Sequence, residues 1–178
     1  AIFVNGISLS TSYRLGKPED LERSEGHDLG LRVLLGRQQA MVSTTDFAED
    51  ALDELVTRAI AMARAVPEDP YCGLLEPNQL AQQWPDLELA DSGEPAPEQL
   101  IEWAKRAEEA ARAVPGVTNS EGGDAGWGRS MKALATSGGF SGSYATSNFS
   151  FSVSVLAGED TGMERDYDYS SKVYFADL

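Results

Sequence analysis

Cysteine and histidine are almost absent from this 178-residue sequence, which has one of each, Cys72 and His27. A single cysteine excludes an internal disulfide bond and fits a reducing compartment. A zinc site would need Asp and Glu for most of its ligands, an uncommon choice for that metal. We interpret Cys72 as a small apolar residue after a helix rather than as a nucleophile, and His27 as an exposed loop residue.

Basic residues are also few: 14 Lys and Arg stand against 29 Asp and Glu, for a formal net charge of −15 at pH 7. Because phosphate binding depends on Lys and Arg displacing counterions, this balance disfavours direct contact with nucleic acid or an anionic membrane. No apolar run approaches the roughly 18 residues of a membrane span, and no signal peptide is visible. We therefore expect a cytoplasmic protein.

Motifs of self-contained active sites are missing. There is no H-E-x-x-H, no pair of cysteines at zinc spacing, no Walker loop and no nucleophile elbow. The glycine-rich segment 122–128 resembles a phosphate loop only in composition, because neither Lys-Ser or Lys-Thr nor a helical pattern follows it. We predict a flexible or bulged hairpin there and a turn at residues 137–140.

The sequence does contain a strictly alternating segment near its C-terminal end. The apolar positions are Phe149, Phe151, Val153 and Val155, and the positions between them are Ser150, Ser152 and Ser154. Successive side chains of a strand point to opposite faces, so the pattern predicts a half-buried strand with a dry face and a wet face.

Shorter alternating segments in the N-terminal quarter predict an antiparallel meander. The four expected strands are residues 2–15, 20–24, 29–35 and 38–43. Turn residues at Asn5-Gly6 and Glu25-Gly26 are expected to break the chain, and Gly36-Arg37 to form a tight connection.

Two segments have helical periodicity. In the first, Asp46 and Glu49 match a capping box, and apolar residues recur on one face until Pro67. In the second, Pro97 occupies the first helical position and an apolar stripe ends before Pro115. The long connection between them is expected to contain a short helix near 78–83 and a short strand near 87–89.

The order of strands, helix, connection, helix and strands predicts an α+β fold, an antiparallel β-sheet with two main helices packed on one face. We expect a single domain over residues 1–178, in which two similar β–α halves, about 1–70 and 90–178, are possible divisions. The sequence lacks an initiator Met and stops abruptly, so we expect a fragment of a longer protein.

The most distinctive polar segment is 165–169. On a strand, Arg165, Tyr167 and Tyr169 share one face, and Asp166 and Asp168 share the other. Tyrosine beside arginine is favoured at contact surfaces, so Arg165, Asp166, Tyr167 and Tyr169 are candidate substrate or partner contacts. The alternative is an exposed edge strand whose charges prevent aggregation.

A second hypothesis is a stand-alone enzyme that uses paired carboxylates, with Glu159-Asp160 and residues 164–168 as candidates. We otherwise predict no catalytic residue and no metal ligand in this chain.

Several short blocks resemble the opening region of the TldD/PmbA family, and more closely its PmbA (TldE) branch. The blocks are residues 21–24, 29–33, 40–46, 61–64, 67–71, 118–122 and 163–169. They lie in family order and cover nearly the whole chain, so the resemblance implies that the chain is the N-terminal domain of a longer protein.

The family is described as modulators of DNA gyrase and as a zinc-dependent peptidase, in which TldD and PmbA form a heterodimer. Its zinc motif, H-E-x-x-x-H, lies on TldD beyond the region corresponding to this chain. The resemblance therefore implies zinc in the partner subunit or in a missing C-terminal region, and none here. It also implies a non-catalytic domain that pairs with a TldD-type subunit, or self-associates, and helps enclose or guide an unfolded peptide. The alternatives are a gyrase-binding module and the N-terminal domain of the peptidase subunit itself.

Overall fold

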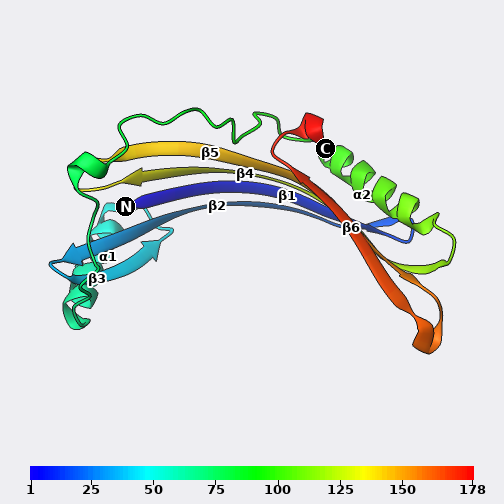
Figure 1. Ribbon diagram of the computed structural model, residues 1–178, viewed down its shortest axis with the longest axis horizontal. Coiled ribbons are helices and arrows are strands. Elements are labelled where there is room, and N and C mark those ends of the chain that lie inside the picture. The colour runs from blue at the N-terminus through cyan, green and yellow to red at the C-terminus, as the bar shows by residue number, and fades with distance from the viewer. The chain divides into compact units, whose positions relative to one another are not determined.

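The computed structural model describes all 178 residues and has an α+β fold (Figure 1). The strands are β1 (Ile2–Arg14), β2 (Lys17–Leu35), β3 (Gln38–Thr44), β4 (Val117–Ala135), β5 (Ser141–Ala157) and β6 (Glu164–Lys172). The helices are α1 (Glu49–Ala65) and α2 (Pro97–Arg112), with short 3-10 turns η1 (Pro77–Gln79), η2 (Asp160–Gly162) and η3 (Phe175–Asp177). The strands form one antiparallel sheet in the order β3-β2-β1-β4-β5-β6, which confirms the predicted fold class.

Residue contacts divide the chain into two compact units. Unit 1 contains residues 1–5, 26–87 and 131–144, and unit 2 contains residues 6–25, 88–130 and 145–178. Strands β1, β2, β4 and β5 contribute residues to both units. The expected single domain, with its possible halves, stays a prediction.

Unit 1 is built on the packing of α1 against β3. Leu55, Ala59 and Ala63 are buried along α1 at helical spacing, as the sequence periodicity predicted. The β2–β3 hairpin turns at Gly36-Arg37, and its register pairs Leu35 with Gln38. The predicted tight connection is therefore confirmed.

Two predicted interruptions of the N-terminal strands are wrong. β1 runs without a break through Asn5-Gly6, and β2 runs through Glu25-Gly26. Neither glycine has a positive φ, so both adopt ordinary strand geometry. His27 therefore lies in β2 rather than in a loop, with its ring 5.0 Å from that of Phe47.

Of the two features predicted for the helix N-termini, the structure confirms one. Pro97 is the first residue of α2, as predicted, and the Gln99 side chain accepts a hydrogen bond from the Ala96 N–H at 2.8 Å. The capping box predicted from Asp46 is wrong, because α1 begins at Glu49 and Asp46 Oδ1 instead accepts from the Ala48 N–H at 2.9 Å. A carboxylate three residues before a helix does not reach the amides that a cap serves.

Two further predictions differ from the structure, one in the connection between α1 and α2 and one in β4. A 3-10 turn, η1, stands at the start of the predicted short helix. Residues 87–89 form no strand, although the Leu89 carbonyl accepts a hydrogen bond from the Ser147 N–H at 3.0 Å and the Glu88 carbonyl accepts one from the Tyr174 hydroxyl at 2.8 Å. The hairpin predicted at 122–128 is wrong, because this segment lies inside β4. The turn predicted at 137–140 joins β4 to β5 and is confirmed.

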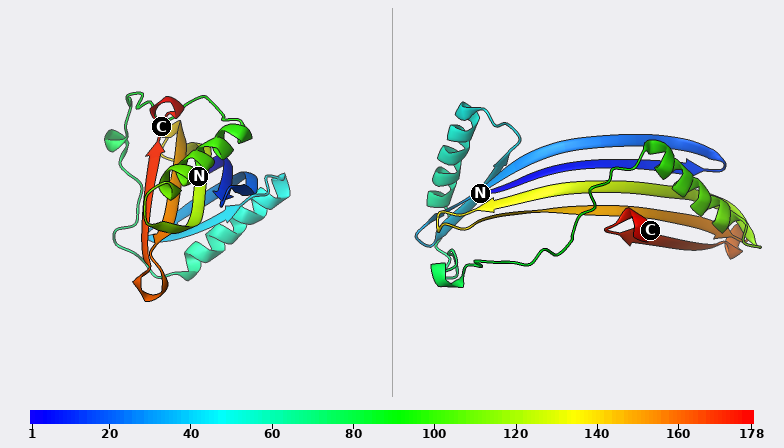
Figure 2. Two further views of the ribbon diagram at one scale, coloured as in Figure 1. Left: turned by 90° about the vertical axis from the view of Figure 1, so that its right-hand side faces the viewer. Right: turned by 90° about the horizontal axis from the view of Figure 1, so that it is seen from above.

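The core of unit 2 forms where α2 packs on strands β1, β4 and β5. Its buried members are Leu9, Tyr13, Leu100, Ala104, Ala125, Trp127 and Phe149. The turn η3 returns to this helix, as Figure 2 shows, and its Phe175 ring stacks on Trp103 at 4.7 Å. Phe175 also contacts Phe149 edge to face at 5.6 Å, so the C-terminal turn extends the aromatic core.

The predicted dry face of β5 holds only in part. Phe149 is 1% exposed and Phe151 packs against the core, as expected. Val153, Val155 and the serines between them are all half-buried, so the contrast between the two faces fades toward the end of the strand.

Helix α2 approaches β4 most closely at Gly123. A Cβ at this position would lie 2.3 Å from the Ala104 carbonyl oxygen, which no real side chain could tolerate without a shift of the helix. Gly122, with φ +113°, precedes it, and the buried positions change there from 120 and 122 to 123, 125 and 127. This change of alternation indicates a β-bulge, which turns Gly123 toward α2.

The close approach predicts that Gly123→Ala destabilises the protein by about 1–3 kcal/mol through overpacking. Gly126→Ala is the control, because its Cβ would make ordinary contacts at 3.7 and 3.8 Å. Urea unfolding of both variants measures the difference, and equal midpoints would show that the helix does not contact the strand this closely.

Candidate functional site

Strand β6 carries all four predicted contact residues and is last in the strand order, so one of its edges has no neighbouring strand. Figure 2 shows it at the margin of the sheet. Tyr167 and Tyr169 are 69% and 68% exposed. The predicted edge strand is confirmed, whereas a contact role for these residues stays a prediction.

The β5–β6 register separates the two faces of this strand as predicted. Tyr167 lies opposite Ser154 and Tyr169 opposite Ser152, while Asp168 lies opposite Val153. Cross-strand partners share a face, so the tyrosines lie on the serine side of the sheet and the aspartates on the valine side.

Arg165 is held by two neighbouring strands. Its Nε lies 2.7 Å from Glu121 Oε2 of β4 and donates to Ser154 Oγ of β5 at 2.9 Å. Ser154 Oγ also donates to the same carboxylate oxygen at 2.7 Å. The charge of Arg165 is therefore balanced within the protein, and the side chain links β4, β5 and β6.

Asp166 and Asp168 turn back onto their own strand. Asp166 Oδ1 accepts a hydrogen bond from the Tyr167 N–H at 2.9 Å, and Asp168 Oδ1 accepts from the Tyr169 N–H at 2.8 Å. Alternate amides of an edge strand point away from the sheet. Two of these amides thus have acceptors without any further strand.

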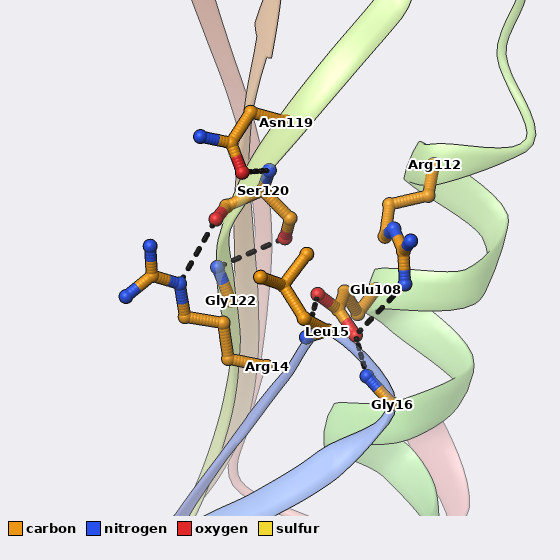
Figure 3. Close-up of polar contacts among 8 residues, drawn as sticks. All are labelled: Arg14, Leu15, Gly16, Glu108, Arg112, Asn119, Ser120 and Gly122. Atoms are coloured by element: carbon orange, nitrogen blue, oxygen red, sulfur yellow. Dashed lines mark hydrogen bonds and ion pairs between the residues drawn. The ribbon is translucent and has the colours of Figure 1, made fainter.

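Sequence reasoning missed Glu108, an acidic residue that is fully buried. Figure 3 shows its carboxylate at the turn between β1 and β2. Oε1 accepts from the Leu15 N–H at 2.7 Å, Oε2 accepts from the Gly16 N–H at 3.4 Å, and Arg112 Nη1 lies 4.0 Å away. Leu15 and Gly16 both have positive φ, 48° and 85°, as a tight hairpin turn requires.

The Ser120 backbone and hydroxyl fix the bulge of β4 (Figure 3). The Ser120 carbonyl accepts from Arg14 Nε at 3.0 Å, and Ser120 Oγ accepts from the Gly122 N–H at 3.0 Å. Asn119 Oδ1 accepts from the Ser120 N–H at 2.8 Å. The block 118–122 therefore has a structural task, to shape the strand beneath α2.

A second polar link joins the connection before α2 to the C-terminal turn. Asp91 accepts from the Gly93 N–H at 2.8 Å and from the Phe175 N–H at 3.0 Å, and these backbone bonds hold the pKa of its carboxyl below the usual value. The Asp91 N–H donates to Ser147 Oγ at 2.7 Å, and this hydroxyl donates to the Val173 carbonyl at 2.7 Å.

Comparison with known proteins gives the family of the chain. Residues 1–63 match the PmbA/TldA metallopeptidase domain 1, and residues 90–178 match the central domain of the same family. The chain belongs to the PmbA/TldA metallopeptidase family. The predicted family resemblance is confirmed.

Two sequence relatives carry the PmbA name. The chain is 36% identical over 174 residues to metalloprotease PmbA of Escherichia coli O157:H7, covering 97% of this chain and 38% of the relative. It is 34% identical over 168 residues to a metalloprotease PmbA homolog of Haemophilus influenzae, covering 94% and 37%. The chain thus spans less than two fifths of the length of these PmbA proteins.

Solved structures share the fold. A candidate modulator of DNA gyrase from Bacteroides thetaiotaomicron superposes with a TM-score of 0.90 at 22% identity, over 99% of this chain and 41% of that one. TldE from Thermococcus kodakarensis superposes with a TM-score of 0.77 at 15% identity, over 97% and 39%. At these identities the likeness shows the fold alone.

The metal of a metallopeptidase does not fit the residues of this family member. No group of three or more His, Cys, Asp and Glu side chains lies close enough together to hold a metal ion.

Asp124 lies near Asp20 and Glu19, and burial together with these like charges raises the pKa of its carboxyl. Glu159 and Asp160, the candidate pair of carboxylates, are exposed at the start of η2. None of the helices has the length and hydropathy needed to span a bilayer.

Replacing Glu108 by Ala should destabilise this PmbA/TldA chain by about 2–4 kcal/mol, because two turn amides lose the buried carboxylate that accepts from them. Glu108→Gln keeps an acceptor for one amide and should lie between the variant and the parent. The exposed neighbour Glu109→Ala is the control, and chemical denaturation is the measurement. If Glu108→Ala unfolds at the same midpoint as Glu109→Ala, the carboxylate does not hold the turn.

The depressed pKa of Asp91 predicts a pH dependence of stability. A carboxyl whose folded pKa lies below its unfolded value stabilises the fold above the unfolded pKa, and this contribution is lost as the pH falls through the folded pKa. The gap in Tm between the parent and Asp91→Asn should therefore be larger at pH 7 than under acidic conditions. Asp53→Asn, an exposed carboxylate of α1, should show no such gap, and a pH-independent effect of Asp91→Asn would contradict the assignment.

Proposed function

We propose that this chain is the N-terminal part of a PmbA-type subunit that serves proteolysis without supplying the metal. In this role it assembles with a TldD-type zinc-bearing subunit in the cytoplasm and guides an unfolded peptide toward it. Zinc held by the TldD-type subunit would supply a metal-activated water for attack on the peptide bond.

One observation carries the proposal: a metallopeptidase family member whose 178 residues contain no group able to hold a metal ion. Its relatives named PmbA are more than twice as long, so catalytic residues could lie in the part of such proteins that this chain does not cover. These 178 residues instead form a sheet that packs against helices and ends in the exposed edge strand β6.

The exposed edge of β6 supports a role in handling peptide. An extended peptide can join a sheet edge through main-chain hydrogen bonds, which do not depend on the sequence of the peptide. Exposed tyrosines next to such an edge add contact area at low cost in conformational entropy. Both features suit a protein that accepts unfolded chains.

Two alternatives remain distinct from this proposal. A gyrase-binding module is suggested by the name of the Bacteroides structure, and the net charge of −15 then favours contact with the protein rather than its DNA. If the full-length protein carries H-E-x-x-x-H beyond residue 178, the chain is instead part of the peptidase subunit itself.

The test uses the full-length protein that contains this chain, alone and mixed with a TldD-type subunit. We expect stoichiometric zinc only in the TldD-type subunit, and cleavage of an unstructured peptide only by the mixture. Glu→Gln in the zinc motif of the TldD-type subunit is the control and should abolish cleavage. Zinc bound by residues 1–178, or full activity of the TldD-type subunit alone, would contradict the proposal.

A further inference from the structure

Acidic residues occupy every second position in the first part of β6. Glu164, Asp166 and Asp168 alternate along the strand, so they share one face at a spacing of about 6.6 Å. All three residues are exposed, and the nearby positive charge of Arg165 is already paired with Glu121. The edge therefore presents a row of carboxylates, and the one basic residue of β6 that shares their face, Lys172, lies four positions after Asp168.

The two aspartates also occupy the amides that an added strand would need. The Tyr167 and Tyr169 N–H groups donate to Asp166 Oδ1 and Asp168 Oδ1. A peptide strand can use these amides only when the carboxylates swing away. A cation placed beside each carboxylate supplies a new partner for it and releases the amide.

A second copy of this chain does not suit the edge. Each copy carries a net charge of −15, and a register that aligns residues 164–168 of two copies would bring acidic side chains together in the row. A segment with basic residues at every second position matches the same row.

We propose that the outer edge of β6 docks an extended peptide that carries Lys or Arg at alternate positions. The basic side chains pair with Asp166 and Asp168, and the peptide backbone takes over the Tyr167 and Tyr169 amides. Residues between the basic ones lie on the other face, against the exposed tyrosine rings. This inference rests on the proposed function and names the class of peptide that the subunit accepts.

Fluorescence anisotropy of labelled heptapeptides with the full-length protein, free of partner subunit, tests the docking. The probe alternates Lys and Val, beginning and ending with Lys. A peptide of the same composition with its four lysines in one block controls for attraction to a protein of net charge −15. A third peptide replaces the central Val by Pro and keeps the charge while removing one backbone N–H.

We expect the alternating peptide to bind at least about fivefold more tightly than the block peptide, and the proline peptide to bind more weakly. The double variant Asp166→Asn with Asp168→Asn should lose at least about fivefold in affinity for the alternating peptide. The double variant Glu159→Gln with Asp160→Asn makes the net charge less negative by the same amount outside β6 and should bind like the parent.

Equal binding of the alternating and block peptides, or equal losses in both double variants, would overturn the proposal and leave only long-range attraction. Because the assay contains neither partner subunit nor peptide cleavage, its failure is distinct from a failure of the proposed function. Zinc and cleavage could follow the expected pattern while β6 binds no peptide.

Discussion

The buried carboxylate of Glu108 is the constraint on which unit 2 depends. It is the only acidic residue among the buried residues, and desolvation of a carboxylate is costly unless donors surround it. The turn amides of Leu15 and Gly16 provide those donors, so α2 is stable at the place where it meets the β1–β2 turn. The missing side chain of Gly123 then lets the helix backbone approach β4.

A series of aromatic contacts and strand pairing connects α2 to β6. Trp103 on the helix stacks on Phe175, Phe175 contacts Phe149 of β5, and β5 pairs with β6 over nine residues. The segment that follows β6 is held by two hydrogen bonds, from the Phe175 N–H to Asp91 and from the Ser147 hydroxyl to the Val173 carbonyl. The edge strand is thus paired on one side only, which leaves the side chains of Tyr167 and Tyr169 exposed, while Asp166 and Asp168 occupy the amides of these two residues.

The sequence predicts the elements whose signals are periodic, and it fails where a tertiary contact decides. Both helices and the faces of β6 follow from spacing alone. Asn5-Gly6 and Glu25-Gly26 have turn composition, but pairing with adjacent strands keeps them extended. Glu108 stands at helical spacing from Leu100 and Ala104, yet only the position of the hairpin turn makes a carboxylate acceptable in that stripe. The bulge at Gly122 likewise depends on Ser120 and Arg14, which local composition does not reveal.

Native-state hydrogen exchange of the 178-residue chain tests most directly whether α2 and the strands beneath it are one cooperative structure. We expect amides of α2 around Ala104 and of β4 around Trp127 to exchange through the same opening, with equal free energies. Exchange of the α2 amides through an opening of clearly lower free energy, while those of β4 stay protected, would contradict it.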